Sequence, residues 1–169
     1  MGTPLPRDPI ADARRNWEEH GWADVAAPMA AITAIMRTQQ ILLARIELVL
    51  KPFGLTFARY ELLALLSFAR NGSLPMKKAS TLLQVHPTSI TNAVDRLQDA
   101  GLVRRSPHPT DGRTTLVELT PDGRTLAKRS TAALNAEVFG ASGFGPEDVD
   151  QLIRILEDFR RNAGDFTDA

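Results

Sequence analysis

The order of elements between residues 76 and 119 constrains the fold of this chain more than any other feature. Apolar spacing and turn residues predict two helices followed by two strands: Met76–Leu83, Thr88–Ala100, Leu102–Ser106 and Thr114–Leu119. The loop between the strands is rich in Pro, Asp and Gly, which favours a hairpin. Helix, turn, helix and hairpin in this order make a winged helix-turn-helix, an arrangement whose second helix enters the major groove of DNA.

The second helix of this unit has an inward and an outward face. Ile90, Val94 and Leu97 recur at i, i+4 and i+7, which is the spacing of one buried helix face. The outward positions carry short hydroxyl and amide side chains and one long cation, which suit phosphates and base edges. These candidate DNA-binding residues are Thr88, Ser89, Thr91, Asn92 and Arg96. A merely solvated helix face is the alternative interpretation.

The zero net charge of the chain, from 20 Lys and Arg against 20 Asp and Glu, hides a separation of charge. Residues 74–113 carry six cations against three acids, a local charge of +3. Residues 145–169 carry three arginines against seven acids, a local charge of −4. Because phosphate contacts need clustered cations rather than a positive chain, the overall balance does not exclude a nucleic-acid partner.

The remaining sequence is predicted to be mostly helical. A short helix is expected at Asp12–Trp22 after a loose arm of ten residues, and Pro28 suits the first turn of a long helix. That helix carries an apolar stripe broad enough for burial by its own core and by a partner subunit. We expect a mainly α (α+β) protein with one domain in four parts: an N-terminal arm and short extra helix at 1–27, a dimerisation helix at 28–55, a winged helix-turn-helix lobe at 56–119 and C-terminal dimerisation helices at 120–169.

Several motifs in these parts resemble the MarR family of bacterial transcriptional regulators, over roughly residues 28–165. The matching runs are Ala79–Leu83, Thr88–Leu97, Gly101–Arg105, Asp111–Arg113 and Leu119–Gly123. Their most specific part is an Asp-x-Arg wing followed by a strand and a Leu-Thr-Pro-x-Gly helix start. The sequence departs from the family at Gln84, where a glycine often stands, so we expect the first helix of the unit to extend by one residue.

The resemblance implies a homodimer that binds double-stranded DNA at a palindromic operator, most often as a repressor. Each subunit would place its second helix in the major groove, with half-sites about 34 Å apart, and its wing along the minor groove. Arg113 would enter the minor groove, whose negative potential favours a guanidinium, and Asp111 would hold it by an ion pair. Four further cations are either phosphate contacts or ordinary surface charges: Lys77, Lys78, Arg104 and Arg105.

The same resemblance implies release from DNA by a small-molecule ligand. A urate-responsive subgroup of the family has a tryptophan on an extra N-terminal helix, and that residue falls on Trp17. The aspartate of the subgroup falls on Glu61 and its two arginines on Ala93 and Arg105, so the lost arginine argues against urate. Another small organic anion, aromatic ones included, would lie between the dimer helices and the lobe. The candidate ligand-binding residues are Trp17, Arg14, Arg15, Arg37, Arg59, Tyr60 and Glu61, and the alternative for Trp17 is a packing role.

Other classes of function find little support in the sequence. The absence of cysteine excludes thiolate metal sites, a cysteine nucleophile and a thiol redox switch. Three scattered histidines and the lack of a nucleophile elbow or phosphate loop predict no metal, no cofactor and no enzyme activity. No run has the character of a signal peptide or membrane span, so we expect a cytoplasmic protein. The main alternative is a winged-helix protein–protein interaction module that does not bind DNA.

Overall fold

The computed structural model describes residues 4–167, so residues 1–3 of the predicted arm lie outside the described residues. Its α-helices are α1 Pro9–Glu19, α2 Ala23–Leu50, α3 Phe57–Phe68, α4 Met76–Leu82, α5 Pro87–Asp99, α6 Pro121–Leu134 and α7 Pro146–Asn162. A short 3-10 turn, η1 Lys51–Phe53, follows α2, and a π-helical turn, η2 Asn135–Phe139, extends α6. The strands are β1 Ser73–Pro75, β2 Val103–Pro107 and β3 Thr115–Leu119. The predicted mainly α architecture with a winged helix-turn-helix is confirmed.

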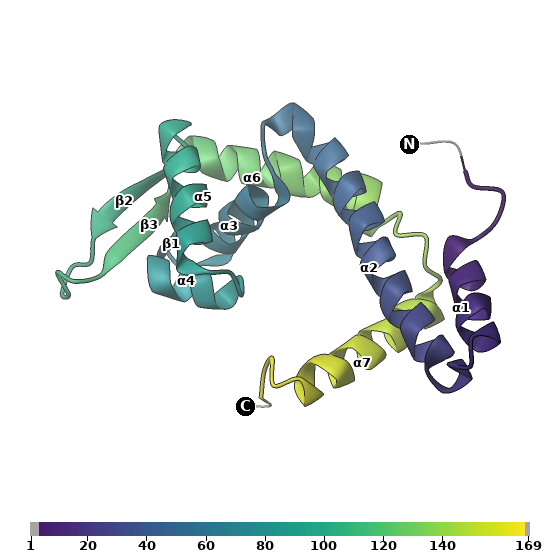
Figure 1. The fold of residues 1–169 in the computed structure, drawn as a ribbon. Helices are drawn as coiled ribbons and strands as arrows, with labels where there is room; N and C mark the ends of the chain where they lie inside the picture. The colour runs from purple at the N-terminus through teal and green to yellow at the C-terminus, as the bar shows by residue number, and fades with distance from the viewer. Residues whose placement is uncertain (1–3, 168–169) are drawn as a thin grey trace.

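The elements form an arch in which a lobe and a group of long helices lie on opposite sides (Figure 1). The lobe holds α3, α4, α5 and the sheet, and α6 runs from it to the upper end of α2. From there α2 descends away from the lobe, and α1 packs along its N-terminal half. The last helix, α7, runs from beside α2 back to a position below the lobe in this view.

The main hydrophobic core lies in the lobe and continues under α6. Helix α3 supplies its centre, because it is apolar on nearly every side and five of its residues are buried. The predicted inward face of α5 is confirmed, with Ile90, Val94 and Leu97 all buried. Strands β2 and β3 close the core with Val103 and Val117. This core fixes the orientation of α5 within the lobe.

The sheet has three antiparallel strands in the order β1-β3-β2, whereas the sequence predicted only a two-stranded wing. Strand β1 pairs with β3 through Leu74 and Val117. The added strand lies on the edge of the sheet and contributes only three residues. It joins the wing to the start of α4, so the wing is anchored to the helix-turn-helix on both sides.

The N-terminal helices begin earlier than predicted. Helix α1 starts at Pro9, capped by the carboxylate of Asp8, which accepts from the backbone N–H of Ile10. Helix α2 starts at Ala23, so the predicted start at Pro28 is wrong and this proline lies inside the helix. Packing of α1 onto α2 explains the longer helix, since Ala26 is fully buried outside the main core. The contact between these helices offsets the hydrogen bond that a proline removes.

The turn between α4 and α5 also differs from the prediction. Helix α4 ends at Leu82 instead of extending, and Gln84 adopts a left-handed conformation with φ of 53°. This conformation costs a non-glycine residue about 1–2 kcal/mol. The Ser80 hydroxyl donates to the carbonyl of Val85 at 2.6 Å and fixes the turn around Gln84. The tight turn is therefore kept without the glycine that would favour it.

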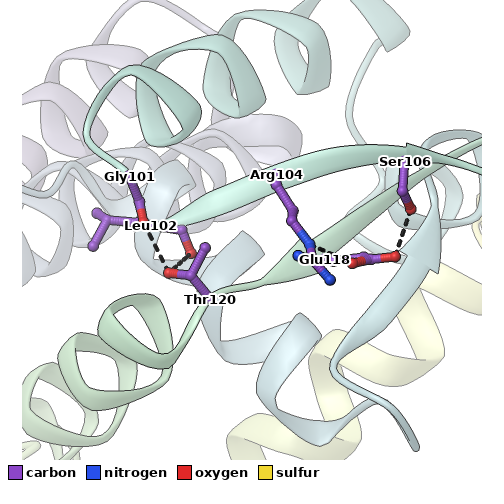
Figure 2. A network of polar contacts seen from close by, with 6 residues as sticks. All are labelled: Gly101, Leu102, Arg104, Ser106, Glu118 and Thr120. Atoms are coloured by element: carbon purple, nitrogen blue, oxygen red, sulfur yellow. Dashed lines mark hydrogen bonds and ion pairs between the residues drawn. The ribbon is translucent and has the colours of Figure 1, made fainter.

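The start of α6 is hydrogen-bonded to the residues that directly precede β2 of the wing (Figure 2). Thr120 caps α6, as its threonine-proline sequence predicts, and accepts from the N–H of Gly123 at 3.0 Å. Its hydroxyl also lies 2.8 and 3.0 Å from the carbonyl oxygens of Gly101 and Leu102. A Cβ on Gly123 would lie only 2.0 Å from the Leu102 carbonyl oxygen, so this close approach requires glycine.

Candidate nucleic-acid interface

The exposed face of α5 is the first part of the candidate interface. The five predicted residues on it are all exposed: Thr88, Ser89, Thr91, Asn92 and Arg96. His86 caps the helix, because its Nδ1 accepts from the Thr88 N–H at 3.2 Å. Thr91 donates to the Pro87 carbonyl, whereas Ser89, Asn92 and Arg96 make no side-chain hydrogen bond or ion pair within residues 4–167. Three polar side chains on this face are therefore available to a partner.

The wing strands carry a polar cluster on the face opposite the core (Figure 2). Glu118 on β3 accepts from the Arg104 Nε at 2.6 Å and from the Ser106 hydroxyl at 2.5 Å, both on β2. The Ser106 hydrogen bond, followed by the Arg104 hydrogen bond, lowers the pKa of the Glu118 carboxyl below its usual value of 4.5. Glu118 therefore stays charged near neutral pH and holds the two strands together.

Arg105 joins the wing to α5. Its guanidinium lies 2.6 Å from the Asp95 carboxylate and 3.4 Å from the Gln98 side-chain oxygen, and both partners are on α5. The side chain is only 26% exposed. The two predicted phosphate contacts on β2 thus have partners within the chain, Arg105 on α5 and Arg104 on β3. Their phosphate contacts stay predictions, and the structure gives both residues a role in positioning the wing.

At the wing tip, the Asp111 carboxylate is hydrogen-bonded to the backbone of Arg113 instead of forming the predicted ion pair with its side chain. The Asp111 carboxylate accepts from the Thr114 hydroxyl at 2.7 Å and from the backbone N–H of Arg113 at 3.0 Å. These two hydrogen bonds lower the pKa of the Asp111 carboxyl, the Thr114 bond most strongly. The Arg113 guanidinium makes no ion pair within the part of the chain that the structure describes. Asp111 therefore shapes the turn, and Arg113 projects its charge into solvent.

The first turn of α4 adds two neighbouring cations. Lys77 and Lys78 are both exposed, and neither forms an ion pair within residues 4–167. Together with Arg113 they place unpaired positive charge at both α4 and the wing tip, on either side of α5 in the chain. An array of donors and cations on one lobe is what a phosphate backbone and a groove require.

Comparison with known proteins identifies the family to which this lobe belongs. A family model described as MarR family matches residues 53–114. The HTH-type transcriptional regulator YhbI of Bacillus subtilis is 31% identical over 134 residues, which cover 79% of this chain and 80% of the relative. The MarR family transcriptional regulator Sco5413 from Streptomyces coelicolor is 48% identical, with a TM-score of 0.76 over 84% of this chain and 99% of that chain. The chain belongs to the MarR family.

A second structural likeness extends the comparison to a complex. The MarR family regulator Sco3205 from Streptomyces coelicolor, solved with DNA, is 23% identical and has a TM-score of 0.70 over 78% of this chain and 85% of that chain. At this identity the likeness shows the shared fold. Family membership makes this chain a DNA-binding transcriptional regulator and not an enzyme, as the sequence predicted. Residues 4–167 contain no group of three or more acidic or histidine side chains that could hold a metal ion.

The candidate ligand-binding residues of this MarR family chain are spread over three helices. Trp17 on α1 packs edge-on against Trp22, with ring centroids 5.4 Å apart. Arg14 pairs with Glu18 on the same helix, at 3.0 Å. Arg15 likewise pairs with Asp12. On α2, Arg37 donates to Gln40 at 3.1 Å and points along its own helix.

The three candidates on α3 have different surroundings. Tyr60 is buried in the core, and its hydroxyl lies 3.2 Å from that of Thr131 on α6. Arg59 donates to Thr56 and to the carbonyl of Gly54, at the entrance to its helix. Glu61 is half-buried, and desolvation raises the pKa of its carboxyl above 4.5. The structure does not gather the seven candidates into one pocket, and a ligand role for them stays a prediction.

Two hollows in the surface were missed by the sequence reasoning. An apolar groove of about 450 Å³ lies between α2 and α7, and none of the seven candidates lines it. The stripes on α2 and α7 were the sequence signal for this groove. A second pocket of about 580 Å³ lies in the lobe, between the C-terminal end of α3, α4 and the wing. The sequence carried no signal for the second pocket, because its walls combine the stretch from α3 to α4 with the wing loop and β3. No helix within residues 4–167 is both long and apolar enough to cross a membrane.

Proposed function

We propose that this regulator is a homodimer that represses transcription from a palindromic operator and leaves DNA when a small organic ligand binds. The exposed apolar surface of α2 and α7 is the observation that supports a dimer. Helix α7 has no buried residue although it is amphipathic, and Ile153 and Phe159 are 57% and 71% exposed. On α2, Ile32 and Met36 are 62% and 59% exposed. Apolar patches of this kind mark protein–protein interfaces.

A second copy of the chain is the partner that fits this surface best. The groove between α2 and α7 is almost wholly apolar, lined by side chains such as Leu42, Leu43 and Leu156. In a two-fold dimer the same patch occurs on both subunits, so one apolar face covers the other. The two lobes would then lie at opposite ends of a shared helical body, as an operator with two half-sites requires.

The proposed contact with DNA follows from the exposed side chains of each lobe. Helix α5 would enter the major groove with Ser89, Asn92 and Arg96, which have no partner of their own among the described residues. The wing would lie along the backbone, with Arg113 in the minor groove, where a guanidinium gains from the negative potential. Lys77 and Lys78 would contact phosphates and make binding strongly dependent on salt.

Repression and release by a ligand draw support from related proteins. The mycobacterial HTH-type transcriptional repressor Rv2887 is 30% identical over 102 residues, which cover 60% of this chain and 72% of the relative. The MarR-like CouR from Rhodococcus jostii, 24% identical, was solved with p-coumaroyl-CoA bound. A ligand that binds better to a dimer with altered lobe spacing would shift the population away from the DNA-competent form.

The experiment is a titration of the full chain against labelled DNA from upstream of its own gene, followed by fluorescence anisotropy. Arg113→Ala should weaken binding at least about fivefold, because a well-placed arginine in a groove contributes about 1–3 kcal/mol. Lys128→Ala is the matched control, since it also removes one exposed positive charge but from α6. Its effect should stay below threefold, and light scattering should find both variants dimeric.

Four results would contradict the proposal. Binding that does not respond to salt, or is absent from every upstream fragment, would argue against operator recognition. Equal affinities of Arg113→Ala and Lys128→Ala would show that the wing tip does not touch DNA. A monomer at micromolar concentration would refute the dimer.

A further inference from the structure

A side chain in the turn of the helix-turn-helix is hydrogen-bonded to the segment that follows α7. Gln84, between α4 and α5, donates from its side-chain nitrogen to the Asp165 carboxylate at 3.1 Å. The two residues are 81 positions apart in the sequence. They can meet because α7 starts beside α2 and runs back to a position below the lobe (Figure 1). The contact therefore joins the lobe to a helix that comes from the other side of the arch.

The end of α7 holds Asp165 in place. Gly164 is left-handed, with φ of 74°, and turns the chain after the helix. Its N–H donates to the carbonyl of Arg161, and the Asp165 N–H donates to that of Arg160, both at 3.0 Å, which is the pattern of a Schellman motif. The Arg160 Nε also donates to Oδ2 of Asp165 at 2.6 Å, and Oδ1 accepts from Gln84. Both carboxylate oxygens thus have a donor.

An aromatic ring anchors the same segment. The Phe166 ring lies below the guanidinium groups of Arg160 and Arg161, whose central carbons are 5.2 and 5.5 Å from its centroid. Cation–π contacts at these distances are attractive. The residues after α7 are therefore held to their own helix by backbone, ionic and aromatic contacts, and Asp165 is presented to the lobe in a defined position.

Gln84 keeps its side chain at the cost of a backbone conformation that suits glycine. Its φ of 53° is left-handed, and glycine would adopt this conformation without strain. A glycine, however, would have no side chain to reach Asp165. Gln84 is separated by one residue from His86, which caps α5. A restraint on the Gln84 side chain therefore acts close to the start of the recognition helix.

Helix α7 has polar contacts at both ends and an open apolar face between them. Before its first turn, Arg45 of α2 donates to the carbonyl oxygens of Ala141 and Ser142 at 2.7 and 3.3 Å. After its last turn, Asp165 accepts from Gln84. None of the residues of α7 itself is buried. The helix thus spans the distance from α2 to the lobe and is fastened to each.

We propose that the hydrogen bond between Gln84 and Asp165 is a latch that positions α5 relative to the dimer helices. The inference rests on the proposed function, because a two-fold dimer must present both α5 helices to two half-sites at a fixed spacing. A lobe that is free to swing would have to be ordered when both half-sites bind, which weakens binding. The latch orders the lobe in advance. Gln84 and Asp165 are therefore positioning residues, which act through the start of α5.

The tolerance of the dimer to operator spacing tests this role. The full chain is titrated by anisotropy against an upstream fragment that it binds, and against the same fragment with one base pair inserted between the footprinted half-sites. The insertion moves the half-sites apart by about 3.4 Å and rotates them by about 34°. Asp165→Ala should bind the native fragment at least threefold more weakly, and its ratio of the two Kd values should be at least threefold smaller than that of the native chain.

Two further variants complete the test. Gln84→Ala should have the effects of Asp165→Ala, and the double variant should add nothing to either, because each single change already opens the latch. Asp150→Ala is the matched control, since it also removes one acid from an exposed position, but in the middle of α7. Both of its Kd values should stay within twofold of those of the native chain.

Hydrogen–deuterium exchange of the full chain without DNA examines the latch separately. In Asp165→Ala, peptides that cover residues 81–86 should exchange at least threefold faster, and in Asp150→Ala at the native rate. Unchanged exchange in Asp165→Ala would overturn the latch. Faster exchange with an unchanged ratio of Kd values, or additive effects in the double variant, would overturn the positioning role. A chain that binds no upstream fragment would refute the proposed function, and with it the role in spacing, while the exchange rates still decide whether the latch exists.

Discussion

The helices of the lobe bury many of their apolar side chains within the chain, whereas the long helices α2 and α7 leave most of theirs exposed. In the lobe, α3 has five buried residues out of twelve, spread around the helix, and α5 has three out of thirteen on the one face towards the core. Helix α7 has none in seventeen, and α2 has three in twenty-eight. The lobe therefore completes its own core within one chain. The long helices present their apolar faces outwards, and the proposed partner subunit would supply the other half of their packing.

Helix α7 is stabilised from within its own sequence. Glu147 and Asp148 lie in its first turn and two arginines lie in its last, which is the arrangement the helix dipole favours. Arg161 pairs with Glu157 at 2.8 Å and with Asp158 at 3.0 Å, one turn earlier. Exposed pairs of this kind contribute only about 0.3–0.5 kcal/mol each. They can bias α7 towards a helix, and in the proposed dimer packing against the partner subunit would fix its position.

The largest effect should come from the core of the lobe. Leu66→Ala removes a fully buried side chain in the last turn of α3 and leaves a cavity, which costs about 2–5 kcal/mol. Urea unfolding followed by circular dichroism should show this as a lower midpoint. Leu48→Ala on α2 is the control, because Leu48 is 72% exposed in the single chain. Equal losses at micromolar concentration would mean that Leu48 is buried in the dimer as deeply as Leu66 is in the lobe.

A second prediction tests whether the exposed apolar face of α7 forms the dimer interface. Ile153→Asp places a charge on the bare apolar face, where a partner subunit would have to bury it without a counter-charge. The dimer should dissociate at least tenfold more readily, which corresponds to about 1.4 kcal/mol or more. Sedimentation velocity over a range of concentrations measures the equilibrium. The lobe should keep its fold, since Ile153 lies outside the core.

Gln151→Asp is the matched control for this variant. It adds the same charge two residues away, at an exposed polar position on α7. Its sedimentation should match that of the native chain. A native-like dimer in Ile153→Asp would show that the subunits meet through a different surface.

Much of the lobe could be predicted from the sequence because its signals are local. The spacing of Ile90, Val94 and Leu97 gave the buried face of α5, and turn residues located both wing strands within a residue or two. The caps Thr56 and Thr120 also stand where their helices begin. In each case a few neighbouring residues determine the outcome, so periodicity and capping rules are sufficient.

The failures lie where distant segments decide the local structure. Strand β1 forms because Leu74 pairs with Val117 on β3. A strand of only three residues beside a glycine has no periodicity from which it could be predicted. Helix α2 begins at Ala23, before Pro28, because α1 packs on its N-terminal half. Likewise, the sequence alone indicates an ordinary surface cation at Arg105, but in the fold its guanidinium lies 2.6 Å from the Asp95 carboxylate. Tertiary contacts override local preference at all these points.

The smallest predicted effect concerns Gln84, where the lobe and the C-terminal segment after α7 meet. The Gln84 side chain donates to the Asp165 carboxylate at 3.1 Å, and Asp165 also accepts from Arg160 at 2.6 Å. Gln84→Ala removes this hydrogen bond and keeps the left-handed backbone, whereas Gln84→Gly removes the bond and relieves the backbone. The difference in stability between the two variants is the backbone strain minus the extra unfolded-state entropy that glycine brings. Gln84→Gly should be more stable than Gln84→Ala by about 1 kcal/mol in urea unfolding. If the two variants unfold at the same midpoint, the left-handed backbone at Gln84 costs no more than the extra unfolded-state entropy of glycine, and the predicted gain from glycine is wrong.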